Sequence, residues 1–233
     1  AFVSSLIGGT SVLIKSAEVI YPEEETPSKG SFAVASALGV IFAIALFILL
    51  PSFASSMIDK YLIRLNELAF ALIEGGIRIL IFVIYLFAVS RMKDIRRTYE
   101  YHGAEHKTIA CYEAGEELTV ENVKKHTRFH PRCGTSFIFI TLIVSILVMC
   151  IVPIYQVVPR MIVSILLLPV VVGISYEFIR IAGRSNNWLT RALSWPGLQI
   201  QRITTREPDA SQIECAIAAL KPCIPEDMED DKW

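Results

Sequence analysis

Long uncharged stretches dominate the pattern of hydrophobic and polar positions. Residues 30–58 contain no charged side chain, and a helix of that length, rising about 1.5 Å per residue, exceeds the roughly 30 Å hydrocarbon core of a bilayer. Residues 68–90 and 134–159 are long enough for two further spans. Residues 161–176 are also uncharged, but they are short for a full crossing unless flanking side chains reach the interface. The pattern therefore predicts about four transmembrane helices.

Amphipathic and polar segments flank these spans. Residues 2–20 are interrupted by glycines and a lysine, so they predict an interfacial or re-entrant helix, followed by an acidic loop. The tryptophan-containing mixture beyond residue 183 is typical of a helix on the membrane surface. Asp209 and Gln212 match a capping box that precedes apolar residues at helical spacing, which predicts a short docked helix. The acidic residues 226–233 are expected to be disordered.

Composition agrees with a lipid environment. Hydrophobic residues make up 53% of the chain, charged residues only 19%, and the mean hydropathy is +0.51, which exceeds that of an ordinary soluble domain. A net charge of −1 provides no basic field, so no nucleic-acid partner is expected. The five cysteines are odd in number and widely scattered, which indicates reduced thiols rather than a disulfide framework.

The positions of the basic residues favour one orientation. The connection between the second and third predicted spans carries nine of them: Arg91, Lys93, Arg96, Arg97, Lys107, Lys124, Lys125, Arg128 and Arg132. The other two connections carry only Lys60, Arg64 and Arg160. By the positive-inside rule the long connection is cytoplasmic, and with four spans both termini lie on that side.

The predicted fold class is therefore an all-α, polytopic membrane protein with interfacial helices and a cytoplasmic cap. Its segments are an amino-terminal interfacial segment (1–29), the first two spans (30–90), a histidine-rich segment (91–133), the third and fourth spans (134–182), and an interfacial helix, docked helix and acidic tail (183–233).

All four histidines lie in the long connection, although lipid packing does not require them there. His102 and His106 would project from one face of a helix and could share a metal, with Glu105 beside them as a general base, in the H-x-x-E-H pattern of inverzincins. His130 and Cys133 could complete the coordination, because zinc accepts imidazole and thiolate together. This arrangement predicts a zinc site.

Alternatives remain open at this stage. Glu113 or Glu177 could serve as a ligand instead. Short patterns recur by chance, Gly103 weakens a helix at the motif, and interfacial histidines can simply cap helices or bond to carbonyls. We favour a metal because four histidines and a cysteine converge on one segment. A complete set of three histidines and one cysteine would leave no position for water, so a structural site is as plausible as a catalytic one.

Two ionisable residues lie inside the second predicted span. Glu74 and Arg78 are four residues apart, so they can pair on one helix face. A charged residue within a span costs roughly 2.5–3.5 kcal/mol on insertion scales. We predict an internal ion pair that fixes helix packing, in preference to a transport or catalytic role.

Several blocks resemble the bacterial YqhQ family over nearly the whole chain. These blocks are residues 74–78, 101–107, 130–137, 204–208 and 211–214. The resemblance implies a bacterial membrane protein of unknown function that is expected to be a metal-dependent enzyme. It includes His130 and Cys133 but not His126, which is therefore the weakest ligand candidate. The glycine-rich amino-terminal segment of that family is not found in this sequence, and a site that uses it is expected to be incomplete.

Two functions fit these observations. The first is a zinc-dependent hydrolase that acts at the cytoplasmic surface of the bacterial cell membrane on a membrane-associated peptide or lipid. The second is a non-enzymatic scaffold or chaperone that assists other membrane proteins, such as those at the translocation channel. A transporter is less favoured, because the chain has no internal repeat. The expected partners are the lipid bilayer and other membrane proteins.

Overall fold

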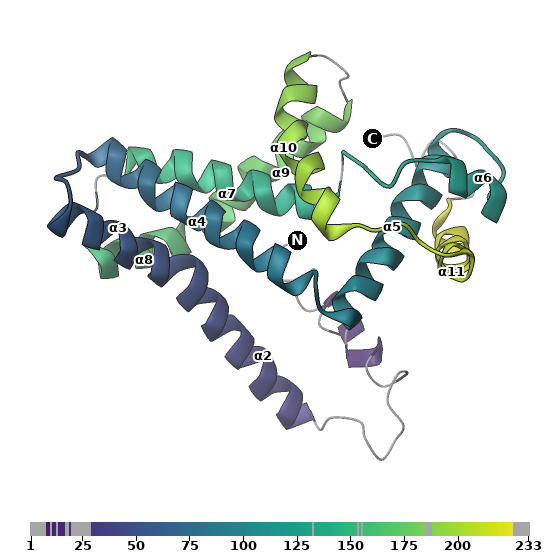
Figure 1. The fold of residues 1–233 in the computed structure, drawn as a ribbon, viewed down its shortest axis with the longest axis horizontal. Coiled ribbons are helices and arrows are strands. Elements are labelled where there is room, and N and C mark those ends of the chain that lie inside the picture. Colours follow the sequence, from purple (N-terminus) through teal and green to yellow (C-terminus); the bar gives the residue numbers. More distant parts are fainter. Residues whose placement is uncertain are drawn as a thin grey trace. The chain divides into compact units, whose positions relative to one another are not determined.

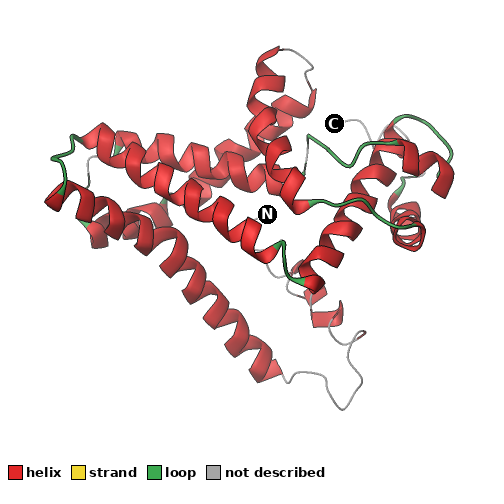
Figure 2. Cartoon of the chain, viewed as in Figure 1, coloured by secondary structure: helices red, strands yellow, loops and turns green. Residues whose placement is uncertain are grey.

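The computed structural model describes residues 29–131, 133–152, 154, 156–184 and 188–225, with scattered positions between residues 8 and 19. Every regular element in this part of the chain is a helix, as Figure 2 shows, which confirms the predicted all-α class. The chain forms two compact units, Ala1–Leu46 and Phe47–Trp233. The predicted acidic tail and most of the predicted amino-terminal interfacial helix lie outside the described residues.

The first apolar stretch is helical throughout. α2 (Lys29–Ile44) is followed by a π-helical turn, η1 (Ala45–Leu49), and then by α3 (Leu50–Tyr61). Pro51 lies in the first turn of α3, where it has no N–H to donate, and the wider π turn immediately precedes it. The residues from Ala33 to Tyr61 are long and apolar enough to cross a membrane, in agreement with the first predicted span.

Two further helices have the length and apolarity of spans. α4 (Glu67–Val89) begins after Asn66, whose side chain accepts a hydrogen bond from the Ala69 N–H, and α7 (Gly134–Ile151) begins after Cys133. α4 packs against both α3 and α7 (Figure 1). Uncharged stretches of this length form helices in lipid because a helix satisfies every backbone hydrogen bond within the segment.

The third predicted span is present, as a helix shorter than its apolar run. α7 ends at Ile151, and Val152 is extended, as expected for a residue that precedes proline, so the helix stops before the apolar run ends at residue 159. The chain resumes in α8 (Val157–Leu166) and α9 (Leu168–Arg184), which are bent by 48° relative to each other. Within the described residues three helices could therefore span a membrane, or four if this bent pair is one broken span.

Three helices outside the spans pack together as a polar cap. They are α5 (Lys93–Glu113), α6 (Val120–Lys125) and α11 (Ala210–Leu220). Their small apolar core consists of Ala104, Cys111, Val123, Ile213 and Ile217. α11 begins with the predicted capping box, in which the Asp209 carboxylate accepts the Gln212 N–H and the Gln212 side chain accepts the Asp209 N–H. The short docked helix is thus confirmed.

The remaining helix, α10 (Trp188–Thr204), connects the spans to the cap. It approaches α7 closely, because a side-chain carbon added at Gly197 would lie 2.6 Å from Ser136. Trp188 and Trp195 are 79% and 60% exposed, which suits an interfacial helix. Its location on the membrane surface stays a prediction.

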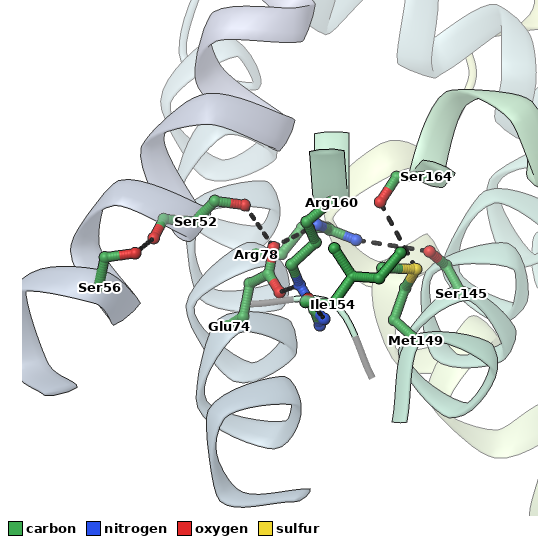
Figure 3. A network of polar contacts seen from close by, with 9 residues as sticks. All are labelled: Ser52, Ser56, Glu74, Arg78, Ser145, Met149, Ile154, Arg160 and Ser164. Carbon is green, nitrogen blue, oxygen red and sulfur yellow. Dashed lines mark hydrogen bonds and ion pairs between the residues drawn. The ribbon is translucent and has the colours of Figure 1, made fainter. Parts of the chain in front are cut away.

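A buried charged network joins α3, α4 and α8 (Figure 3). Glu74 pairs with Arg78 one turn along α4, at 3.2 Å between Oε1 and Nη2, as their spacing predicts. The other Glu74 oxygen lies 2.5 Å from Arg160 Nε, and the Ser52 hydroxyl donates to Oε1. None of these four residues is more than 6% exposed. The carboxylate of Glu74 therefore holds three helices together.

The network contains more positive than negative charge. Arg160 was expected in a connection between spans, but it lies inside α8 and is 1% exposed. Two guanidinium groups thus face one carboxylate. Neutral acceptors bind part of the excess guanidinium N–H groups. Arg160 Nη1 donates to the Ile154 carbonyl at 2.8 Å, and Arg78 Nη1 donates to the Ser145 hydroxyl at 3.4 Å. Glu74 is accordingly the one member whose loss leaves buried charges unopposed.

This asymmetry predicts a rank order of stability in detergent. Glu74→Leu leaves two buried cations and should cost about 3–5 kcal/mol, whereas Arg78→Leu leaves a balanced Glu74–Arg160 pair and should cost much less. Melting temperatures of the purified variants measure this order. Glu177→Leu removes one member of an exposed pair with Arg180 and serves as the control. If Arg78→Leu melts as low as Glu74→Leu, the charge-balance account is wrong.

Candidate metal centre

Three of the predicted ligands come together where α5 of the cap meets the start of α7. His102 and His106 lie one turn apart on α5, with ring centroids 4.4 Å apart. Cys133 is the residue before α7, and its Sγ lies 3.3 Å from His102 Nε2. The ligand atoms of all three residues lie within 4.8 Å of one another. Tetrahedral zinc with bonds of about 2.0–2.3 Å separates its ligand atoms by roughly 3.5 Å, so this donor set fits zinc.

Backbone carbonyls orient both imidazoles. The Thr204 carbonyl lies 2.9 Å from His102 Nδ1, and the Arg128 carbonyl lies 2.7 Å from His106 Nδ1. Because a carbonyl can only accept, each Nδ1 carries a proton, which leaves Nε2 as the ring atom that could bind a metal. This arrangement is the one commonly found behind metal-ligating histidines, where the second ring nitrogen is hydrogen-bonded to a carbonyl or carboxylate.

The carbonyl of Thr204 is held in place by close backbone packing against α5. The Arg206 N–H donates to the Tyr99 carbonyl at 2.8 Å, and the Arg206 carbonyl lies directly against Gly103, where any Cβ would collide with it. Gly103 is therefore required for this approach, although it disfavours helix in isolation. The Arg128 guanidinium donates to both the carbonyl and the hydroxyl of Thr205, which ties the second carbonyl to the same segment.

His130 lies beside the three ligands without joining them. Its ring centroid is 5.8 Å from that of His106, and its Nε2 lies 3.3 Å from the Glu113 carboxylate. The fully buried side chain of Gln201 fixes the His130 backbone, accepting its N–H at 2.8 Å and donating to its carbonyl at 2.6 Å. Gln201 also donates to Ser136. The segment that leads to Cys133 is thereby anchored to α10.

The three glutamates considered as ligand or base differ in their contacts with the histidines. Glu105 is exposed on α5, whereas His106 is buried. Its charge helps to raise the pKa of His102, as the smallest of several contributions. Glu177 is exposed and pairs with Arg180 on α9. Glu113 is the carboxylate in contact with the histidine cluster, through His130. The role of Glu105 as a base stays a prediction.

The electrostatics of the site favour a thiolate. Burial alone would raise the pKa of the Cys133 thiol, but hydrogen bonds with His102, His106 and Thr135 lower it to about 5. The hydrogen bond to Cys133 is also the main cause that raises the pKa of His102, against the opposing effect of burial. Cys133 precedes the first turn of α7, where the helix dipole adds to the stabilisation of negative charge. The site therefore holds the form of cysteine that binds metal.

A second group in the cap also has metal-ligand chemistry. Cys111, Glu116 and His126 place their ligand atoms within 4.8 Å of one another, with His126 Nε2 3.4 Å from the Glu116 carboxylate. Burial raises the pKa of the Cys111 thiol, so its thiolate is disfavoured, and Glu116 is exposed. This group is the poorer metal set of the two.

Several residues of the site carry no signal in the sequence. Gln201 and Thr204 act through groups that any polar helix contains, and Arg128 contributes its main-chain carbonyl to the site. In the sequence, the block at residues 204–208 is part of the family resemblance only. In the structure this block packs against α5, and its Thr204 carbonyl contacts His102.

Apolar helices of span length joined to a polar cap with a His₂Cys cluster define an integral membrane protein with a candidate metal centre. The chain belongs to the family described as "Protein of unknown function (DUF1385)", whose model matches residues 1–226. It is 37% identical over 208 residues to "Uncharacterized protein YqhQ" of Bacillus subtilis (strain 168), which confirms the YqhQ resemblance. The match covers 87% of this chain and 65% of that relative, so this chain spans about two-thirds of its length. No solved structure matches this chain.

The thiolate can be tested in chelator-treated protein. The ultraviolet thiolate absorbance that is lost in Cys133→Ser should titrate near pH 5, well below the ordinary cysteine pKa of about 8.5. Because this pKa is lower in the folded chain than in the unfolded one, the thiolate stabilises the fold at high pH, and this contribution fades as the pH falls toward about 5. His102→Ala should move the titration upward, while His126→Ala should not. A Cys133 titration above pH 8 in the parent would contradict the assignment.

Proposed function

We propose that this protein is a zinc-dependent hydrolase that acts at the cytoplasmic surface of the bacterial cell membrane. The observation that carries the proposal is the convergence of His102, His106 and Cys133, with both imidazoles already oriented by backbone carbonyls. The hydrogen bonds suit a metal site, because metal-ligating histidines usually have their second ring nitrogen bonded to a carbonyl or carboxylate. Three protein ligands leave a fourth position for substrate or water, as in catalytic zinc sites.

The chemistry divides between the metal and the chain. Zinc held by these ligands would supply Lewis acidity, which polarises a carbonyl or phosphoryl oxygen of the substrate. His130 and Glu113 form a hydrogen-bonded pair at the edge of the cluster, and we assign to them the transfer of a proton to or from the reacting group. Glu105 and Glu113 are both exposed, but Glu113 is hydrogen-bonded to His130, so it is the better suited of the two to this task.

The position of the site favours a substrate from the membrane. Cys133 directly precedes α7, a helix of span length, so the site lies where this apolar helix begins. A peptide or lipid that emerges from the bilayer beside α7 would present its polar linkage at this level. The substrate class that fits best is therefore a membrane-embedded peptide or lipid with a hydrolysable carbonyl or phosphoryl group.

Metal content is the first test. Protein purified without chelator should carry about one zinc per chain, and His106→Ala or Cys133→Ser should lose it because each removes a ligand. His126→Ala changes a histidine of the second group and should retain the zinc. Metal analysis of the three variants measures this. Background zinc in the parent, grown with ample metal, would end the proposal.

A second test separates a catalytic from a structural metal. In cobalt-substituted protein, a small hydroxamate should change the visible spectrum, because an open coordination position accepts it. Glu113→Gln should retain the metal but alter the pH dependence of this change, whereas the matched Glu105→Gln should behave like the parent. A spectrum that hydroxamate leaves unchanged would indicate a closed structural site, and would support the non-enzymatic membrane scaffold or chaperone instead.

A further inference from the structure

A pocket of about 370 Å³ lies where the end of α4, the start of α5 and the end of α10 meet. Four of its lining residues are arginines: Arg91, Arg96, Arg202 and Arg206. Among the described residues that line it, none is acidic. Arg91, Arg96 and Arg202 are exposed and Arg206 is partly buried, so the pocket opens to solvent with an excess of positive charge, which favours binding of an anion.

Aromatic contacts fix two of these arginines without neutralising them. The Arg91 guanidinium lies 4.4 Å from the Phe87 ring centroid, and that of Arg202 lies 5.9 Å from the Phe129 centroid. Such contacts restrict the side chains while leaving their in-plane N–H groups able to donate. Arg96 pairs with Glu100 at 3.3 Å, so the other three arginines have no carboxylate partner among the described residues.

The fourth arginine has an unsatisfied donor. Arg206 Nε is buried and has no hydrogen-bond partner within the described residues. Its backbone is fixed by the hydrogen bond to Tyr99 and by the contact with Gly103. This Nε is closed off from solvent, so a ligand in the pocket would meet the other N–H groups of the Arg206 guanidinium.

The location indicates the source of the anion. α4 is a span candidate that ends at Val89, and the pocket begins on its last turn. Phe87, which is 52% exposed, and Ile203 provide apolar lining beside the arginines. A lipid headgroup meets this combination at the end of a span, with the phosphate near basic side chains and the acyl chains along the helix.

We propose that this pocket binds the phosphate group of an anionic phospholipid. Arginine binds phosphate oxygens through paired N–H groups, and the volume is within the range of small-ligand sites. The same chemistry would accept a soluble phosphate, but the apolar lining favours a lipid. The inference does not depend on a metal, because none of the lining arginines belongs to the His₂Cys cluster.

The test uses the full chain in mild detergent, titrated with phosphatidylglycerol or phosphatidylcholine and followed by native mass spectrometry. The parent should bind phosphatidylglycerol in preference to phosphatidylcholine. Arg91→Gln with Arg202→Gln should weaken phosphatidylglycerol binding by about tenfold or more, because charged hydrogen bonds are lost. Arg64→Gln with Arg97→Gln removes the same charge outside the pocket and should change it little.

Two further arms keep the result decisive. Arg91→Lys with Arg202→Lys preserves the charge but not the paired N–H geometry, so a smaller loss of phosphatidylglycerol binding is expected. If the glutamine variant does not fold, the lysine variant tests whether these two side chains bind the lipid. Inorganic phosphate and glycerol phosphate are added as competitors. Equal losses in the pocket and control variants would overturn the proposal in favour of general charge attraction. Binding of soluble phosphate with no preference for phosphatidylglycerol would overturn the lipid assignment.

Discussion

The close packing of residues 204–207 against α5 at Gly103 is the contact on which both candidate sites depend. It places the Thr204 carbonyl on His102 and supports Arg128, whose own carbonyl holds His106. The same segment carries Arg206 into the arginine pocket. Backbone-to-backbone approach of this kind needs a residue without a Cβ, so one glycine in a helix that would otherwise prefer alanine makes the shared architecture possible. The histidine cluster and the pocket therefore share a structural support.

A second constraint operates among the spans. Charged groups within apolar helices must be opposed by other charges, since desolvation in hydrocarbon is costly. Glu74 meets this need for both Arg78 and Arg160, and it thereby holds α8 against α4. α8 is short and bent relative to α9, so its own apolar length would not define its position. The contact between Glu74 and Arg160 therefore contributes to the position of α8 at this end of the spans.

The proposed metal site and the proposed lipid site both lie at the boundary between the spans and the cap, and each can be tested without the other. A His₂Cys cluster beside the first turn of α7 would act on a group at the membrane boundary, and an arginine pocket at the end of α4 would hold a phospholipid phosphate. Both are built where span-length helices meet the cap. A bound lipid would brace the segment that carries Arg206 and Thr204, and so would also stabilise the orientation of His102. Membrane association would then support the metal site directly.

Local patterns were sufficient for the features that depend on neighbours in sequence. The i,i+4 spacing of His102 and His106 placed both on one helix face, and uncharged length predicted the spans, because helical geometry and lipid thickness act locally. The tertiary structure alone decided that Cys133 joins the two histidines while His130 turns to Glu113, that Glu105 is exposed, and that Arg160 is buried beside Glu74. Each of these depends on how segments far apart in the sequence pack together. Sequence spacing carries no measure of such distances, and only the packing of α7, α8 and α10 against the other helices determines them.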